Sequence, residues 1–122
     1  MANSDFQRID VQYGDPVTRI RLKDNKILDQ LLVKQIAEEL RTLVQDEQRS
    51  RLLFDLSNVT FLSSAALNNL VILNRHVAKQ SGRIVLAELQ PPVREVFSYT
   101  GLNRLFTIVD SMDDGYAAFV EA

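Results

Sequence analysis

The sequence predicts an α/β fold, a single domain over residues 1–122 in which a mixed, mostly parallel sheet is flanked by about four helices. Its 122 residues are 46% hydrophobic and 25% charged, which is typical of one soluble globular domain. From residue 51 onward, apolar runs alternate with helical patterns, and this order favours right-handed crossovers onto a parallel sheet. A turn signal near the start adds an N-terminal hairpin or edge strand, which makes the sheet mixed.

The N-terminal part predicts two strands and a helix. Strands are expected at 5–13 and 17–22, with the turn chemistry of Gly-Asp-Pro at 14–16 between them. Residues 23–27 are interpreted as a polar connector. The segment 29–48 predicts an amphipathic helix, because its apolar residues recur at helical spacing. Those residues are Leu32, Ile36, Leu40 and Leu43.

The remaining chain alternates strands with helices. The runs at 51–56 and 83–89 are continuously apolar, which predicts strands that are covered on both faces. A third strand is expected at 105–110. The pattern predicts helices at about 64–80, 91–101 and 113–122.

Several residues mark the expected helix ends. Gly82 stands at a natural C-cap position for the helix that precedes it. Prolines open the helix at 91–101 and Gly101 closes it. Asp113 and Asp114 fall near the positive end of the last helix, where carboxylates are stabilising.

Two adjacent serines lie where an apolar strand hands over to a helix. At about 100° per residue, one side of this helix must face the sheet; it carries Ala66, Leu67, Leu70, Leu73 and Val77. The opposite side carries Ser64, Asn68, Ile72, Arg75 and Lys79. Ser63 is therefore predicted to cap the helix, and Ser64 to lie at its exposed start. Spacing alone leaves open whether Ser64 has a function or only begins a helix.

Composition excludes several classes of function. The net charge is −2, with Lys and Arg scattered along the chain, so there is no reason to expect a nucleic-acid partner. The absence of cysteine removes disulfides and thiolate chemistry. The first ten residues lack the apolar core of a secretory signal, and no run approaches the length of a membrane span. We therefore expect a cytoplasmic protein with no membrane partner.

Catalysis is not expected either. A Ser-His-Asp arrangement would have to join Ser64 to His76, the one histidine, roughly 18 Å further along the same helix. The sequence has no G-x-S-x-G elbow, phosphate-binding loop or dinucleotide fingerprint. Asp113 and Asp114 have no further ligands at a recognisable spacing, so they are interpreted as helix-start charges. We expect no cofactor and no metal.

The segment from Phe54 to Leu67, FDLSNVTFLSSAAL, resembles the signature of the STAS family, the domain of sulphate transporters and anti-sigma-factor antagonists. The resemblance covers nearly the whole chain and is again specific from Val93 to Ile108. It implies the STAS fold, and by position it puts Ser64 where the family carries a phosphorylated serine. Ser63 replaces the aspartate that commonly precedes it, and Ala66 replaces the usual glycine.

The resemblance also implies a function. In the family, the unmodified antagonist sequesters an anti-sigma factor that is also a serine kinase, and the sigma factor is released. Phosphorylation of Ser64 would then block docking, and a phosphatase would be a further partner. The docking surface is expected to be bordered by Asp55, Ser57, Thr60, Ser63, Asn68 and Ile72. The substitutions at Ser63 and Ala66 leave an alternative, a STAS-like scaffold or ligand-binding module that is never phosphorylated.

Overall fold

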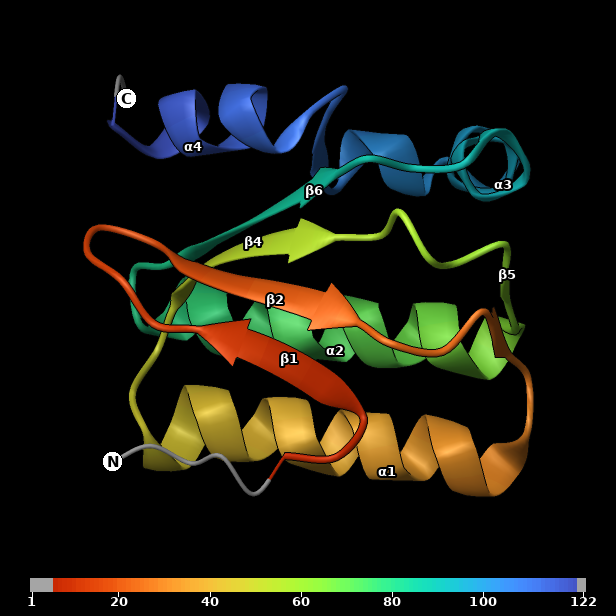
Figure 1. The fold of residues 1–122 in the computed structure, drawn as a ribbon, viewed down its shortest axis with the longest axis horizontal. Helices are drawn as coiled ribbons and strands as arrows, with labels where there is room; N and C mark the ends of the chain where they lie inside the picture. Colours follow the sequence, from red (N-terminus) through yellow and green to blue (C-terminus); the bar gives the residue numbers. More distant parts are fainter. Residues whose placement is uncertain (1–5, 121–122) are drawn as a thin grey trace.

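The structure is a computed structural model that describes residues 6–120. Its main sheet has five strands in the order β1-β2-β4-β6-β7 (Figure 1). The strands are β1 (Ile9–Gln12), β2 (Thr18–Leu22), β4 (Arg51–Asp55), β6 (Arg83–Ala87) and β7 (Thr107–Val109). Only β1 runs antiparallel to its neighbour, and the other pairs are parallel. The predicted mixed sheet with an N-terminal hairpin is confirmed.

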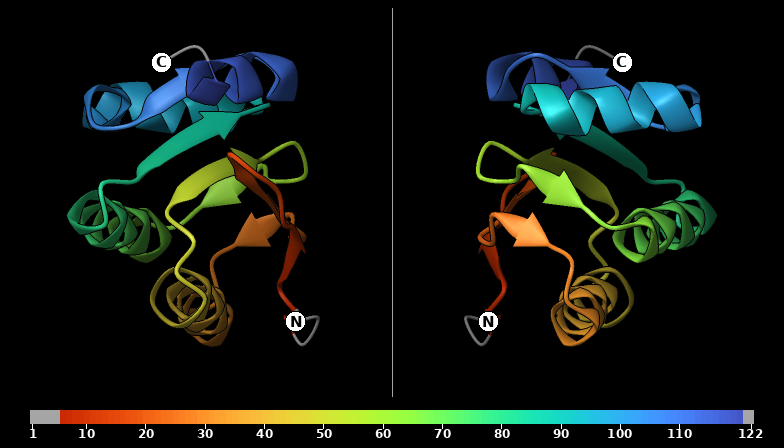
Figure 2. Two further views of the ribbon diagram at one scale, coloured as in Figure 1. Left: turned by 90° about the vertical axis from the view of Figure 1, so that its left-hand side faces the viewer. Right: turned by 90° about the vertical axis from the view of Figure 1, so that its right-hand side faces the viewer.

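The helices cover both faces of this sheet. They are α1 (Gln30–Arg41), which continues as a π-helical turn η1 (Thr42–Asp46), α2 (Ser64–Lys79), α3 (Pro91–Thr100) with a 3-10 turn η2 (Leu102–Arg104), and α4 (Met112–Val120). Figure 2 shows α1 and α2 side by side against one face, with α4 on the other side of the sheet. The four predicted helices are confirmed.

The central strands are apolar throughout because each face has its own cover. On β4, Leu52 and Phe54 belong to the core beneath α1 and α2, whereas Leu53 belongs to the smaller core beneath α4. On β6, Leu86 and Val85 divide in the same way. Alternate side chains of a strand point to opposite faces, so continuous apolar sequence is what a doubly covered strand requires. The predicted burial on both faces is confirmed.

A second, small sheet was not predicted. β3 (Lys26–Ile27) pairs in parallel with β5 (Phe61–Leu62), so the interpretation of residues 23–27 as a connector without structure was wrong. The pairing continues at both ends, where Thr60 N–H donates to the Asn25 carbonyl at 2.8 Å and Ser63 N–H to the Ile27 carbonyl at 3.0 Å. Two-residue strands are too short to show a periodic pattern, and their partners are distant in sequence.

The end of α2 also differs from expectation. Gly82 does not adopt the left-handed conformation; Ser81 does, with φ 61°. Gly82 N–H donates to the Val77 carbonyl at 2.7 Å and Ser81 N–H to the Ala78 carbonyl at 3.0 Å, which is a Schellman motif with serine in the left-handed position. Gly82 has another role, because a Cβ there would overlap the backbone of Ser50.

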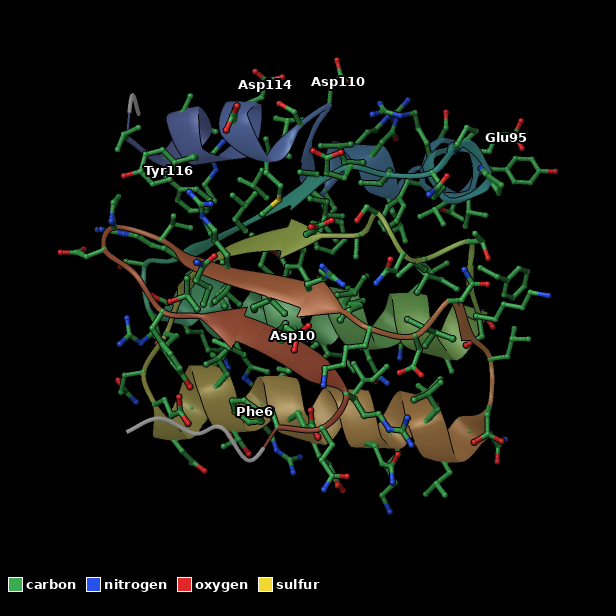
Figure 3. All side chains as sticks on the ribbon, in the orientation of Figure 1. Phe6, Asp10, Glu95, Asp110, Asp114 and Tyr116 are labelled. Carbon is green, nitrogen blue, oxygen red and sulfur yellow. The ribbon has the colours of Figure 1, made fainter. Side chains whose placement is uncertain are left out.

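The C-terminal elements follow the prediction closely. Gly101 closes α3 in the left-handed conformation with φ 80°. Asp113 and Asp114 lie in the first turn of α4, and Figure 3 shows Asp114 pointing away from the body of the molecule. The strand is shorter than the predicted 105–110, because the backbone N–H groups of Leu105 and Phe106 donate to the Leu102 carbonyl and continue the turn of η2. Residue 5 of the predicted first strand and residues 121–122 of the last helix lie outside the described residues.

Candidate functional site

The two serines at the start of α2 have different environments. Ser63 is the N-cap, with extended backbone angles, and its Oγ accepts the Ala66 N–H at 3.1 Å. The Ser63 carbonyl accepts the Leu67 N–H at 3.0 Å. Ser64 is the first helical residue and is exposed. The predicted cap at Ser63 and the predicted exposure of Ser64 are both confirmed.

An exposed stripe runs along α2 from Ser64. Asn68 and Ile72 follow it at intervals of four residues, one and two turns further on, and both are exposed. Ile72 keeps 39% of its surface, which is high for a large aliphatic side chain in a folded domain. The opposite side of the helix is buried, as its sequence spacing predicted; it carries Ala66, Leu67, Leu70, Leu73 and Val77.

The loop between β4 and β5 is held by side chains at its start. Asp55 is half-buried at the end of β4, and its Oδ1 accepts the Ser57 N–H at 2.9 Å. Gln90, just before α3, donates from Nε2 to the Ser57 carbonyl at 2.6 Å. Asp55 therefore binds a loop amide. Gln90 was missed, because nothing in the local pattern links it to a loop that lies 33 residues earlier.

Asn25 holds the second half of the same loop. Its Nδ2 donates to the Asn58 carbonyl at 2.9 Å, and its Oδ1 accepts from Thr60 Oγ1 at 3.0 Å. The side chain and the backbone of Asn25 thus fix the segment that leads into the two serines. Sequence reasoning missed Asn25 because its importance arises only when β3 and β5 pair.

Exposed apolar side chains border the start of α2. Phe61, on β5, is 46% exposed, and Leu28 is 49% exposed directly after Ile27, whose carbonyl binds the Ser63 N–H. We call Leu28, Phe61, Ser64, Asn68 and Ile72 the Ser64 surface. Apolar groups gathered beside polar ones are typical of docking surfaces. The sequence signal for Phe61 was an apolar residue next to the serine pair.

The Ser64 surface has little charge of its own. The segment of α2 from Ser64 to Asn74 contains no ionisable side chain, and the first charged residue of the helix is Arg75. A group that added charge at Ser64 would therefore place it on a stretch of the helix that has none. Within residues 6–120, no three His, Asp or Glu side chains gather closely enough to hold a metal ion.

His76, the one histidine of the sequence, is out of reach of Ser64. His76 lies on the same unbroken helix, twelve residues further on, and its Nδ1 is 3.4 Å from Gln45 Nε2. The helix rise alone separates the two residues by roughly 18 Å. The described residues also contain no helix with the length and hydropathy needed to cross a bilayer.

Known proteins share both the sequence pattern and the fold. The pattern of the STAS domain family matches residues 15–115. BtrV of Bordetella bronchiseptica, which is named as an anti-sigma factor antagonist, is 34% identical over 89 residues, or 73% of this chain and 76% of that protein. The chain therefore has a relative of closely similar extent.

Solved structures give the same picture at lower identity. The anti-sigma factor antagonist SpoIIAA in its unphosphorylated form superposes with a TM-score of 0.77 at 19% identity, over 93% of this chain and 97% of that one. An anti-sigma factor antagonist from Mycobacterium paratuberculosis gives 0.77 at 24% identity, over 90% and 91%. SpoIIAA of Bacillus is also known in a phosphorylated form, which gives 0.66 at 20% identity, over 87% of this chain and 95% of that one. These likenesses show a common fold.

Proposed function

This chain belongs to the STAS domain family, and we propose that it is an anti-sigma-factor antagonist whose docking is switched by phosphorylation of Ser64. Unmodified, it sequesters an anti-sigma factor that has serine-kinase activity, and a sigma factor is released. A phosphatase that removes the phosphate completes the cycle. The role is a non-enzymatic one in the cytoplasm, and it requires no cofactor, nucleic acid or membrane.

The exposed hydroxyl of Ser64 is the observation that carries this proposal. Capping is already provided by Ser63 Oγ, so Ser64 is not needed to complete the helix. Its side chain is exposed, which a kinase requires of an acceptor. The chemically similar neighbour is half-buried and engaged with Ala66 N–H, so the pair offers one acceptor rather than two.

A phosphate at this position would change association more than folding. It adds roughly two negative charges at neutral pH. The amides of Ser64 and Ala65 have no acceptor among the hydrogen bonds of the described chain, and such helix N-termini stabilise anions. The domain can therefore accept the charge without unfolding. A partner seated on the same surface would have to desolvate that charge, which is costly.

The proposed docking surface combines an exposed stripe with a supporting loop. Asn68 and Ile72 are exposed and supply the contacts we expect a partner to make directly. Asp55, Ser57, Thr60 and Ser63 are half-buried and hydrogen-bonded, so we assign them to holding the shape of the surface rim.

Ser64→Asp should weaken binding to the cognate anti-sigma factor, because a carboxylate is left in the interface, whereas Ser64→Ala should bind normally and resist modification. Isothermal titration calorimetry with the purified partner measures both. Ser81→Asp is a matched control, since it adds the same charge at the opposite end of α2. Equal affinities of Ser64→Asp and Ser64→Ala would contradict the proposal.

A second candidate is a STAS scaffold that is never phosphorylated. It is favoured by Ser63 and Ala66, which stand where the family commonly has aspartate and glycine. Mass spectrometry of the protein from its own cells distinguishes the two candidates. A phosphate on Ser64 excludes the scaffold, and unmodified Ser64 under every growth condition excludes the switch.

A further inference from the structure

A groove between α1 and α2 lies beside the Ser64 surface and shares Ile72 with it, but none of its other lining residues belongs to the proposed docking surface. Its volume is about 240 Å³. α1 and α2 lie against each other on one face of the sheet (Figure 2), and Leu22 and Ile27 form part of the groove floor. The apolar walls include Val33, Ala37 and Leu40 from α1 and Ala66, Leu70 and Leu73 from α2.

Small side chains keep this groove open. Ala37 and Ala66 each contribute one methyl group to walls whose other apolar side chains are leucine, isoleucine and valine. Small-molecule sites are concave and mostly apolar, and this groove has both properties. Ile72 lies on the lining and remains 39% exposed, which places it at the mouth.

The charge on the groove is of one sign. Arg41 and His76 belong to the lining, and no acidic residue does. The two helices start directly after the paired strands β3 and β5 and run in the same direction, so Arg41 and His76, each about three turns from its helix start, lie at the same level. Arg41 joins none of the three ion pairs found within residues 6–120. An apolar groove with an unpaired cation at one end fits an apolar anion.

We propose that the groove binds an aliphatic carboxylate of medium chain length. The chain would lie between α1 and α2, and the carboxylate would accept hydrogen bonds from Arg41 and from the ring N–H of His76. About 240 Å³ equals the space of roughly eight waters in the liquid, which suits a chain of roughly eight carbons. Polar groups at one end of an apolar pocket set ligand orientation in many small-molecule sites.

Titration of the isotope-labelled protein with hexanoate and octanoate, below micelle formation, tests the site by amide chemical shifts. Saturable shifts are expected in the segments around Ala37, Arg41 and Asn69. Each added methylene should tighten binding by roughly two- to fourfold while it is buried. At equal chain length, octanoate should bind more tightly than 1-octanol, and octylammonium should bind most weakly.

Variants separate the apolar groove from its charge. Arg41→Gln should weaken octanoate binding roughly 1.4- to 5-fold, the range of an exposed charge pair, and leave 1-octanol binding unchanged. Lys34→Gln is the matched control, since it removes a cation from α1 outside the lining and should change neither ligand. Ala37→Phe should fill the groove and abolish the binding of both octanoate and 1-octanol. A thermal melt checks that this variant folds, and the test with Arg41→Gln does not depend on it.

Two results would overturn the assignment. One is the absence of saturable shifts at the groove with any carboxylate. That result includes the case where the groove responds only to a protein partner. The other is equal binding of octanoate and octylammonium with no effect of Arg41→Gln. The site does not depend on the switch, so Ser64→Asp should leave octanoate affinity unchanged even if the proposed function fails.

Discussion

At the residue scale, adjacent side chains of one type are given different tasks by their backbone positions. Ser63 is extended and bonds back into the helix, whereas Ser64 is helical and faces solvent. Helical geometry at 100° per residue was enough to predict this division from the sequence, because a long amphipathic helix fixes the direction of each residue relative to its buried side. What the pattern could not supply was whether the Ser64 hydroxyl is phosphorylated, as we propose.

Ser63→Ala should destabilise the fold by about 1 kcal/mol, because the Ala66 N–H loses its acceptor. Urea unfolding followed by circular dichroism measures the difference. Ser64→Ala is the matched control and should stay within about 0.5 kcal/mol of the wild type. Ser63→Asp should also stay close to the wild type, since aspartate caps as well as serine. Equal losses for the two alanine variants would mean that the cap is not at Ser63.

The end of α2 shows where residue-level prediction fell short. Glycine is the usual residue in the left-handed position after a helix, and Gly82 was assigned to it on that ground. The chain instead places Ser81 there, because Gly82 is needed one position later, against the backbone of Ser50. Positions 81 and 82 both favour glycine, and only the tertiary contact with Ser50 decides that the glycine stands at position 82.

Ser81→Gly should therefore stabilise the protein by about 0.5–1 kcal/mol, because glycine adopts positive φ without the steric cost that serine bears. The midpoint of thermal unfolding should rise accordingly. Ser98→Gly, on the exposed side of α3, is the control and should destabilise, since glycine in a helix interior costs up to about 1 kcal/mol. A fall in stability for Ser81→Gly would contradict the strained serine.

At the element scale, the candidate site depends on a pair of strands too short to be visible in the sequence. β3 and β5 place the start of α2 next to the start of α1. The side chain of Asn25, just before β3, binds Asn58 and Thr60, just before β5. The long elements were predictable because their periodic patterns extend over several turns or over a whole buried strand. The short pair was not, because its stability comes from contacts between residues about 35 positions apart.

Asn25→Ala should loosen the loop that leads into α2. It removes the donor to the Asn58 carbonyl and the acceptor for Thr60 Oγ1, so amide hydrogen exchange over residues 57–63 should speed up while that of β4 and β6 stays slow. The loss in global stability should be about 1–2 kcal/mol. Asn103→Ala, exposed on η2, is the control. Unchanged exchange in the loop would show that the backbone pairing alone holds it.

At the scale of the whole molecule, the two ends of the parallel strands have separate roles. The register of β2 with β4 sets Thr18 beside Leu52 at the first end, where these strands begin, and Arg21 beside Asp55 at the second end. The loop to Ser64 leaves from the second end, and the turn between β1 and β2 lies at the first end (Figure 1). The parallel order of the strands accounts for this separation, since loops that follow parallel strands meet at one end of the sheet. The hydrogen bond from Tyr13 to Glu47, which joins the residue after β1 to the residue after η1, was not predictable from that order.

At the first end, Tyr13 gives the stability a dependence on pH. Tyr13 Oη donates to Glu47 Oε1 at 2.5 Å; burial, together with this bond and the Glu47 charge, raises the pKa of Tyr13 from 10.0 to about 12, against a smaller opposing effect of Arg49. Because the folded pKa is the higher one, the protonated phenol stabilises the fold below pH 10, and that contribution is lost as the pH rises from 10 through about 12.

Tyr13→Phe should flatten this part of a plot of denaturation midpoint against pH, whereas Tyr99→Phe, a change at an exposed ring, should not. Glu47→Gln should move the phenolate absorbance transition of Tyr13 toward pH 10. Neither change should affect binding at the Ser64 surface, and a Tyr13→Phe curve identical to that of the wild type would refute the assignment.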